Sequence, residues 1–315
     1  MQGTVDGFNY GVVTPVAAYL MAVLGGALGL RCTTRSLRTD QGWKPGWLAL
    51  GATSIGSGIW TMHFIAMIGF QVEEAPVSYD VPTTVLSLFV AIVMVGVGVF
   101  IVGYRGATRA TLTTAGTITG LGVAAMHYIG MSGMRLHGRL EYDTTTVVLS
   151  VVIAVVAATA ALWAAVSIHG FLPSLGASLV MGVAVTGMHY TGMAAISVHL
   201  QSATGGSAGG GSPTSIMFPL LLGPAVFLVL AGVVVMFDPL LVLGEGEWDR
   251  PIGKKPVRNG AAPRPVPPPP PAYGDVNGGR AQTPTPPPAH TRPPQAPTSA
   301  PGAHRGAGPR GPYDW

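Results

Sequence analysis

Three copies of one short motif carry the side chains of this sequence that are best suited to chemistry. In each copy a methionine directly precedes a histidine, an aromatic residue follows it, and a second methionine stands four residues after the histidine. The three histidines are His63, His127 and His189. Placing an ionisable side chain inside a long apolar segment is costly, so such a residue is a candidate functional group. The motif therefore predicts a site assembled from three equivalent pieces.

The methionines of the motif fall into two sets. Residues four apart project from one face of a helix, so the second set shares the face of the histidines. This second set consists of Met67, Met131 and Met193. The side chains of the first set point about 100° away around the helix axis, so they can reach the same region only from the neighbouring face of the helix. It consists of Met62, Met126 and Met188. Thioether sulfur is a soft ligand that selects copper, and imidazole also suits copper, so we predict a copper site.

Two other interpretations of the motif stay open. A haem held between two histidines on different helices would use the same imidazoles. Alternatively, the repeat has simply duplicated a packed pair of histidine and aromatic ring, with methionine as an ordinary filler of apolar gaps. The presence of three evenly spaced copies favours the metal or cofactor site over the packing pair.

The motifs lie within seven apolar segments of about 20 residues, the length that crosses about 30 Å of hydrocarbon as a helix. Only 10% of all residues are charged, against roughly 25% in an ordinary soluble domain. We therefore expect an all-α, polytopic membrane protein. The expected spans are 12–30, 47–70, 83–102, 112–134, 146–167, 175–198 and 216–237.

An internal repeat relates these spans to one another. The histidines stand 64 (127 − 63) and 62 (189 − 127) residues apart, and a glycine stands seven residues before each one. Tyr79-Asp80 and Tyr142-Asp143 are followed at identical offsets by a serine and an alanine. A repeat of this kind predicts three two-helix units plus a closing helix. Each motif then lies near the carboxyl end of the second, fourth or sixth span, which places the three histidines at a similar depth.

Charge in the connecting segments predicts the orientation in the membrane. Lys and Arg gather in the first loop, in the third loop and after the last span, which are cytoplasmic by the positive-inside rule. These residues are Arg31, Arg35, Arg38, Lys44, Arg105, Arg109, Arg250, Lys254, Lys255 and Arg258. Arg135 and Arg139 are an exception in an outer loop. The amino end has no positive start of a cleavable signal peptide, so we expect it outside, with the histidines near the outer face and the carboxyl end in the cytoplasm.

Residues 1–243 form the expected transmembrane domain, and residues 244–315 form a tail of different character. The tail is rich in Pro, Gly, Ala and Arg, and residues 265–271 are nearly all proline. Such a composition cannot bury a core, so we expect a disordered cytoplasmic tail with polyproline II character. A passive tail is favoured over a partner-binding one.

The sequence contains few features that indicate a catalytic or nucleic-acid-binding function. It contains no phosphate-binding loop, no pairing of a nucleophile with a base and no pair of carboxylates within a span. The chain is therefore predicted not to be an enzyme. Its net charge of +4 is interpreted as a matter of membrane topology rather than of nucleic-acid binding. His137 and His199 are expected in solvated loops, His169 on the cytoplasmic side, and Asp238 at the end of the last helix.

The motif resembles that of the MHYT family of bacterial membrane sensors, which is named for Met-His-Tyr-Thr. Residues 188–191 match it completely, whereas residues 126–129 (Met-His-Tyr-Ile) and 62–65 (Met-His-Phe-Ile) depart at the later positions. The resemblance covers roughly residues 10–240.

The resemblance implies a plasma-membrane protein that binds copper near the outer face and senses a diatomic gas such as O2, CO or NO. The implied ligands are His63, His127 and His189, with Met62, Met126 and Met188. Family members are often fused to cyclic-di-GMP enzymes, and no such output module is recognisable in this sequence. We therefore expect a sensor that signals through a separate partner protein, with copper handling or transport as the rival function.

Overall fold

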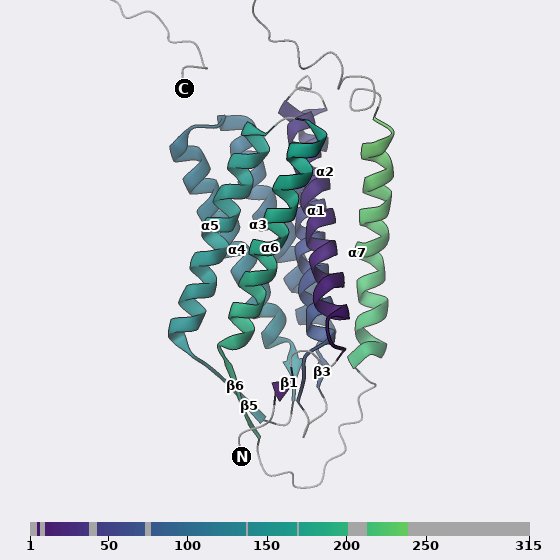
Figure 1. Cartoon of the computed structure of the whole chain (residues 1–315), viewed down its shortest axis with the longest axis vertical. Coiled ribbons are helices and arrows are strands. Elements are labelled where there is room, and N and C mark those ends of the chain that lie inside the picture. Colours follow the sequence, from purple (N-terminus) through teal and green to yellow (C-terminus); the bar gives the residue numbers. More distant parts are fainter. Residues whose placement is uncertain are drawn as a thin grey trace, which may run out of the picture. The chain divides into compact units, whose positions relative to one another are not determined.

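A computed structural model describes residues 5–6, 10–37, 43–72, 77–136, 138–168, 170–200 and 213–238. The chain divides into two units, residues 1–253 and 254–315, and all the described residues belong to the first. The predicted tail, His137 and His169 lie outside the described residues. The described residues form seven helices, which confirms the all-α fold (Figure 1). They are α1 (Val13–Leu37), α2 (Lys44–Ile68), α3 (Val81–Arg105), α4 (Arg109–Ser132), α5 (Thr144–Ser167), α6 (Phe171–Ala194) and α7 (Pro213–Met236).

Helices α1 to α6 form a closed ring. Each packs against its neighbours in sequence, and α6 also packs against α1, while α7 lies outside the ring against α2 and α1. The ring therefore contains the three predicted two-helix units, α1–α2, α3–α4 and α5–α6. In this arrangement the even-numbered helices all run in the same direction, so their carboxyl ends meet at one end of the bundle (Figure 1).

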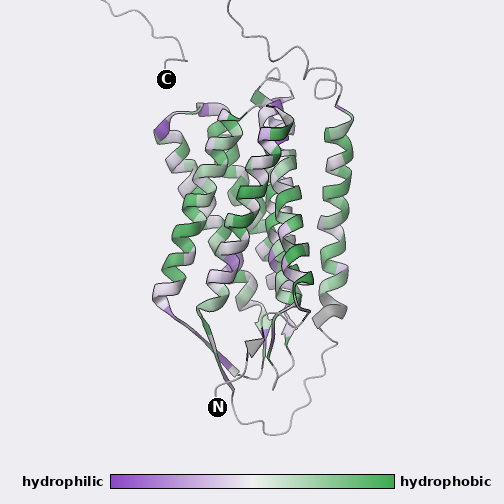
Figure 2. Cartoon of the chain, in the orientation of Figure 1, coloured by the Kyte–Doolittle hydropathy of each residue, from purple (hydrophilic) through white to green (hydrophobic). Residues whose placement is uncertain are grey.

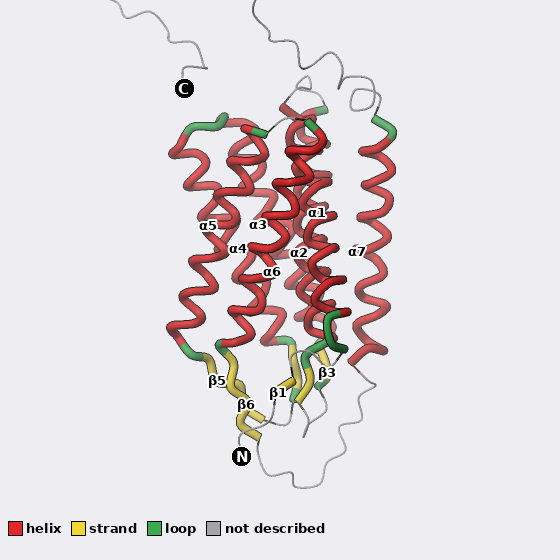
Figure 3. The backbone as a smooth tube through the Cα atoms, viewed as in Figure 1, coloured by secondary structure: helices red, strands yellow, loops and turns green. Residues whose placement is uncertain are grey.

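Three short antiparallel ribbons lie at that same end (Figure 3). Each ribbon pairs the segment before an odd-numbered helix with the segment after the following even-numbered helix. The pairs are β1 (Val5–Asp6) with β2 (Gln71–Val72), β3 (Ser78–Tyr79) with β4 (Met134–Arg135), and β5 (Gly138–Tyr142) with β6 (Ile196–Leu200). The ribbons thus fasten each two-helix unit at the end where the histidine motifs lie. The sequence analysis did not predict these strands.

The repeated Tyr-Asp pair begins α3 and α5. Asp80 accepts hydrogen bonds from the backbone N–H of Thr83 at 3.0 Å and from its hydroxyl at 2.6 Å. Asp143 accepts the equivalent bonds from Thr146 at 3.1 and 2.8 Å. Each aspartate therefore caps orphan donors of the first turn. The hydrogen bonds from the Thr83 hydroxyl and N–H, in that order, hold the pKa of Asp80 below its ordinary value.

The chain is a multi-pass membrane protein. Five helices, α1, α3, α5, α6 and α7, are long and apolar enough to cross a bilayer. Helices α2 and α4 are less apolar by this measure, because they contain many glycine, serine and threonine residues and one histidine each. In the ring, each of them packs between two of the apolar helices. Large apolar side chains stay exposed on the outer faces, as lipid contact requires, and Figure 2 shows how far the apolar character extends along the helices. Examples are Phe89, Val156, Trp163, Val180 and Leu230.

One expectation about the helix ends was wrong. The first span was expected to end at residue 30, but α1 continues to Leu37, so Arg31 and Arg35 lie on the helix rather than in a loop. Asp238 follows the last helix, as expected, and its carboxylate also accepts a hydrogen bond from Nε of Arg35 at 2.6 Å. Arg35 is only 14% exposed. The ion pair joins the ends of α1 and α7 and allows the last turns of α1 to remain helical among apolar neighbours.

Candidate metal centre

The three motif histidines converge on one point inside the ring. Nδ1 of His63 lies 3.0 Å from Nδ1 of His189 and 3.1 Å from Nδ1 of His127. The ring centroids are 4.9, 4.9 and 5.2 Å apart, and each side chain is at most 1% exposed. The equal depth predicted from the repeat is thus confirmed, and the structure adds that the imidazoles face one another through Nδ1.

Glycines allow the imidazoles to enter the centre. A Cβ atom at Gly130 would lie 2.7 Å from Nε2 of His63, and one at Gly192 would overlap Nε2 of His127. Each of these glycines stands three residues after the histidine of the next motif. The imidazole of one unit therefore rests on the helix backbone of the following unit. At the same position of the first motif the sequence has Ala66.

The aromatic residue after each histidine packs against its imidazole. The centroid distances are 4.6 Å for His63–Phe64, 4.8 Å for His127–Tyr128 and 5.1 Å for His189–Tyr190. These contacts fix the ring planes from outside the centre. The histidine–aromatic contact that the sequence analysis considered as an alternative to metal binding is therefore present in all three copies, alongside the convergence of the imidazoles.

In the first motif, the indole N–H of Trp60 takes the place of the tyrosine hydroxyl that the second motif contains. In the second motif the hydroxyl of Tyr128 shares a hydrogen bond with Ser150 at 2.6 Å. In the first motif Phe64 has no hydroxyl, and the indole N–H of Trp60 instead donates to Ser87 at 2.9 Å. Ser87 and Ser150 occupy the same offset in the repeat. The sequence analysis missed this substitution, although the serine that both copies retain was visible.

Protons alone satisfy the nitrogen atoms of the centre only in part. A neutral imidazole has one N–H and one lone pair, yet Nδ1 of His63 faces two other Nδ1 atoms. In addition, Nε2 of His63 and Nε2 of His127 are buried without a hydrogen-bond partner among the described residues. Each unsatisfied buried polar group costs about 1–3 kcal/mol. A cation between three inward lone pairs would remove the mutual repulsion and leave each Nε2 as the protonated nitrogen.

The spacing of the nitrogens fits a metal ion. Three nitrogens each about 2.0–2.1 Å from one ion at tetrahedral angles lie about 3.3–3.4 Å apart. The two Nδ1 pairs at 3.0 and 3.1 Å need to open by only a few tenths of an ångström. The ligand atoms of the cluster all lie within 4.8 Å of one another. The buried three-histidine cluster can therefore hold a metal ion.

The geometry disfavours the haem interpretation. Two histidines that share a haem stand on opposite sides of its flat macrocycle. Here Nδ1 of His63 lies directly against the Nδ1 atoms of both His127 and His189. A macrocycle could enter only if the three helices moved apart.

The six methionines of the motifs are buried to different degrees. Met62, Met126 and Met188 are buried, as are Met67 and Met131. Met193 is half-buried and packs against the same apolar core. The participation of these sulfurs as ligands stays a prediction.

The remaining described histidine lies away from the centre. His199 is on β6 and 46% exposed, and its Nε2 lies 3.3 Å from the carboxylate of Glu141 on β5. It is a surface residue of the longest ribbon, as the sequence analysis expected, and it belongs to no metal cluster among the described residues.

Known proteins share the repeat that builds this centre. The family model for MHYT, described as a bacterial signalling protein N-terminal repeat, matches residues 56–115 and 120–178. The chain carries MHYT repeats. The two matched repeats contain His63 and His127. The third motif, with His189, lies beyond the matched residues but completes the same centre.

Relatives of this MHYT chain are membrane signalling proteins. It is 36% identical over 207 residues to the bifunctional diguanylate cyclase/cyclic di-GMP phosphodiesterase MucR of Pseudomonas aeruginosa, covering 64% of this chain and 30% of MucR. It is 34% identical over 217 residues to the cyclic di-GMP phosphodiesterase NbdA of that species, covering 64% and 27%. It is 32% identical over 169 residues to the signalling protein YkoW of Bacillus subtilis, covering 51% and 21%.

The chain thus spans less than a third of the length of these curated relatives. The shared part is the sensor domain of signalling proteins. No solved structure matches the chain.

Proposed function

We propose that this MHYT domain is a copper-based sensor in which His63, His127 and His189 hold one copper ion through Nδ1. The observation that carries the proposal is the convergence of three buried imidazoles in which Nδ1 of His63 lies 3.0 and 3.1 Å from the Nδ1 atoms of His189 and His127, contacts that neutral imidazoles can satisfy only by sharing one N–H of His63 between two acceptors. The described residues bring no carboxylate or thiolate into this cluster. Neutral nitrogen ligands with soft sulfur nearby suit copper better than magnesium or calcium.

The methionines one turn beyond the histidines support copper in particular. Met67, Met131 and Met193 continue the helical faces of the three imidazoles toward the ribbon end of the bundle. Met67 and Met131 are buried. Soft sulfur of this kind close to the ion would favour Cu(I).

The proposed signal is a diatomic gas such as O2, CO or NO. Copper held by three imidazoles would supply a further coordination position for such a ligand. A gas can act as a signal only if it binds two arrangements of the helices with different affinity. The imidazoles of His63 and His127 rest directly on the backbones of α4 and α6, at Gly130 and Gly192. A small shift of a ligand ring would therefore press on the neighbouring helix.

Charge at the two ends of the ring supports an orientation with the histidines toward the outside. Arg35, Arg105 and Arg109 lie at the end opposite the ribbons, and the positive-inside rule assigns such an end to the cytoplasm. The amino end would then be outside and the carboxyl end inside. Since relatives with this domain are named as cyclic di-GMP enzymes, we propose that output passes through α7 to a signalling partner of that class. That the chain is not itself an enzyme stays a prediction.

Carbon monoxide tests the proposed function. The protein in nanodiscs would be loaded with Cu(I), and the infrared C–O stretch of bound gas would be recorded with and without His127→Ala. A sharp band that vanishes in the variant supports the proposal. A copper-loaded protein that shows no band, or the same band in the variant, contradicts it.

A further inference from the structure

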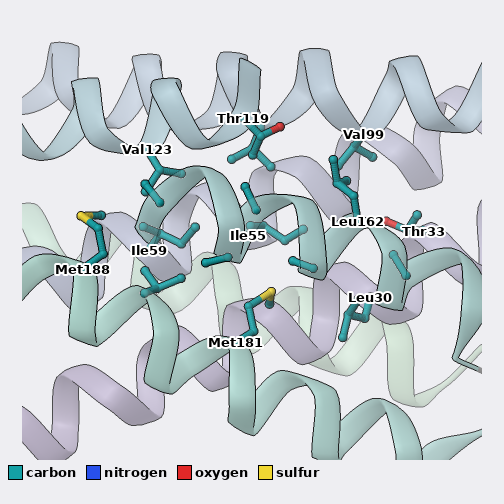
Figure 4. Close-up of a pocket in the computed structure, with 17 residues that line it drawn as sticks. Leu30, Thr33, Ile55, Ile59, Val99, Thr119, Val123, Leu162, Met181 and Met188 are labelled. Carbon is teal, nitrogen blue, oxygen red and sulfur yellow. The ribbon is translucent and has the colours of Figure 1, made fainter. Parts of the chain in front are cut away.

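An apolar cavity of about 50 Å3 lies between the helices of the ring (Figure 4). All six helices α1 to α6 contribute to its wall. Among the lining residues only Thr33 and Thr119 carry a hydroxyl, and that of Thr33 donates to Gly29 of its own helix at 2.8 Å. The wall is therefore hydrocarbon apart from methionine sulfur and the Thr119 hydroxyl, which has no hydrogen-bond partner among the described residues.

The cavity and the metal centre share the same helical faces. Ile59, Val123 and Val185 line the cavity, and each stands four residues before a histidine of the centre. One helical turn, about 5.4 Å, therefore separates this layer from the imidazoles. Met188, which is adjacent to His189 in sequence, is also part of the wall, and Figure 4 shows it at the same end of the cavity as Ile59 and Val123. One end of the cavity therefore lies about one helical turn from the three histidines.

Small side chains on α5 create the space. Ala158 lies eight residues after Ser150, at the offset that Val95 has after Ser87 in the preceding unit, and both residues line the cavity. Other alanines of α5 continue the wall, namely Ala154, Ala157, Ala161 and Ala165. Protein interiors are close-packed, and alanine leaves room at Ala158 and Ala165, where the equivalent positions of α3 hold Val95 and Val102.

We propose that this cavity is a binding site for a small apolar gas molecule, which it holds ready for the metal centre. One water needs about 10–15 Å3 of such volume and about two to four polar partners, whereas the unpaired polar group of this wall is the single Thr119 hydroxyl, so the cavity favours an apolar occupant over water. The site therefore has room for a diatomic molecule but not for a haem, a quinone ring or a hydrated ion. This inference rests on the proposed function, because the cavity would hold the gas molecule that the copper then binds.

Xenon tests the cavity without any metal. The metal-free protein in nanodiscs would be titrated with xenon and followed by 129Xe NMR, alongside Ala158→Phe. The control is Ala160→Phe, the same change on an exposed position of α5. We expect saturable binding in the wild type and in the control, and its loss in Ala158→Phe. Absence of saturable binding in the wild type, or its persistence in Ala158→Phe, would overturn the proposal.

An enlarging variant covers the case in which Ala158→Phe does not fold. Leu162→Ala widens the same wall and is expected to bind xenon more tightly than the wild type; unchanged or weaker binding would overturn the proposal. Electron density for a lipid acyl chain in the cavity would also overturn it. Copper content, measured separately on the same samples, distinguishes the two proposals, because a protein that binds xenon but no copper contradicts only the proposed metal function.

Discussion

The imidazole of His127 rests on the backbone of α6 at Gly192, so closely that a single added methyl group would overlap Nε2 of the ring. We therefore expect Gly192→Ala to displace His127 and to weaken copper binding. Gly187 on the same helix has open space beside it, so Gly187→Ala is the matched control. In a helix interior, alanine is more stable than glycine by roughly 0.5–1 kcal/mol, so the control should be slightly more stable, with normal copper affinity. Equal copper affinity in both variants, measured by competition with a Cu(I) chelator, would contradict the described contact.

The hydrogen bond from Trp60 to Ser87 replaces the missing tyrosine hydroxyl of the first motif. Ser87→Ala removes the acceptor at 2.9 Å and leaves the buried indole N–H with only the Thr84 carbonyl at 3.3 Å. We expect a loss of about 1 kcal/mol in the free energy of unfolding. Ser178→Ala is the control, because the Ser178 hydroxyl donates to Leu175 of its own helix. Unfolding in mixed micelles measures both, and a Ser87→Ala variant no less stable than the control would count against this role.

The ion pair between Arg35 and Asp238 fastens the end of α7 to α1. Breaking a buried pair costs about 3–5 kcal/mol, and we expect about 1–3 kcal/mol for Asp238→Ala because Arg35 keeps some exposure to solvent. Hydrogen exchange in the last turn of α7 should rise in Asp238→Ala. The charge swap Arg35→Asp with Asp238→Arg should restore much of the protection. Exchange that is unchanged in the single variant would show that α7 is held in another way.

The caps of α3 and α5 predict a dependence on pH. Hydrogen bonds from Thr83 and Thr146 lower the pKa of Asp80 and of Asp143, respectively. A carboxyl group whose folded pKa is lowered stabilises the protein above its unfolded pKa of about 3.9, and this contribution is lost as the pH falls through the folded value. Thermal stability of the wild type should therefore fall below about pH 4 more steeply than that of Asp80→Asn combined with Asp143→Asn. Parallel curves for the two proteins would contradict the assignment.

The repeat made the positions of the helices and the depth of the histidines predictable. Seven apolar runs define seven helices, and equal offsets within the repeat place His63, His127 and His189 on equivalent turns. The distances between these three helices could not be predicted from the sequence. They depend on residues such as Gly130 and Gly192, whose lack of a side chain becomes informative only when the neighbouring imidazole is known. Closure of the ring by α6 against α1 also joins residues that no sequence offset relates.

The short ribbons and the extended α1 escaped prediction for physical reasons. A strand of two residues, such as Val5–Asp6 or Gln71–Val72, has no periodicity to recognise, and its partner lies far away in sequence. The last turns of α1 look like a charged loop until Asp238, about 200 residues later, is seen to neutralise Arg35. Long-range pairing of this kind becomes visible only in the folded chain.

The measurement that tests the account most directly is the metal content of the purified protein. Copper, iron and zinc per chain would be determined by elemental analysis for the wild type, for His63→Ala/His127→Ala/His189→Ala, and for the exposed control His199→Ala. We expect about one copper per chain in the wild type and in His199→Ala, and none in the triple variant while its helical content persists. A wild type that takes up no copper even after loading, or a triple variant that keeps it, would contradict the assignment of the three histidines as the metal centre.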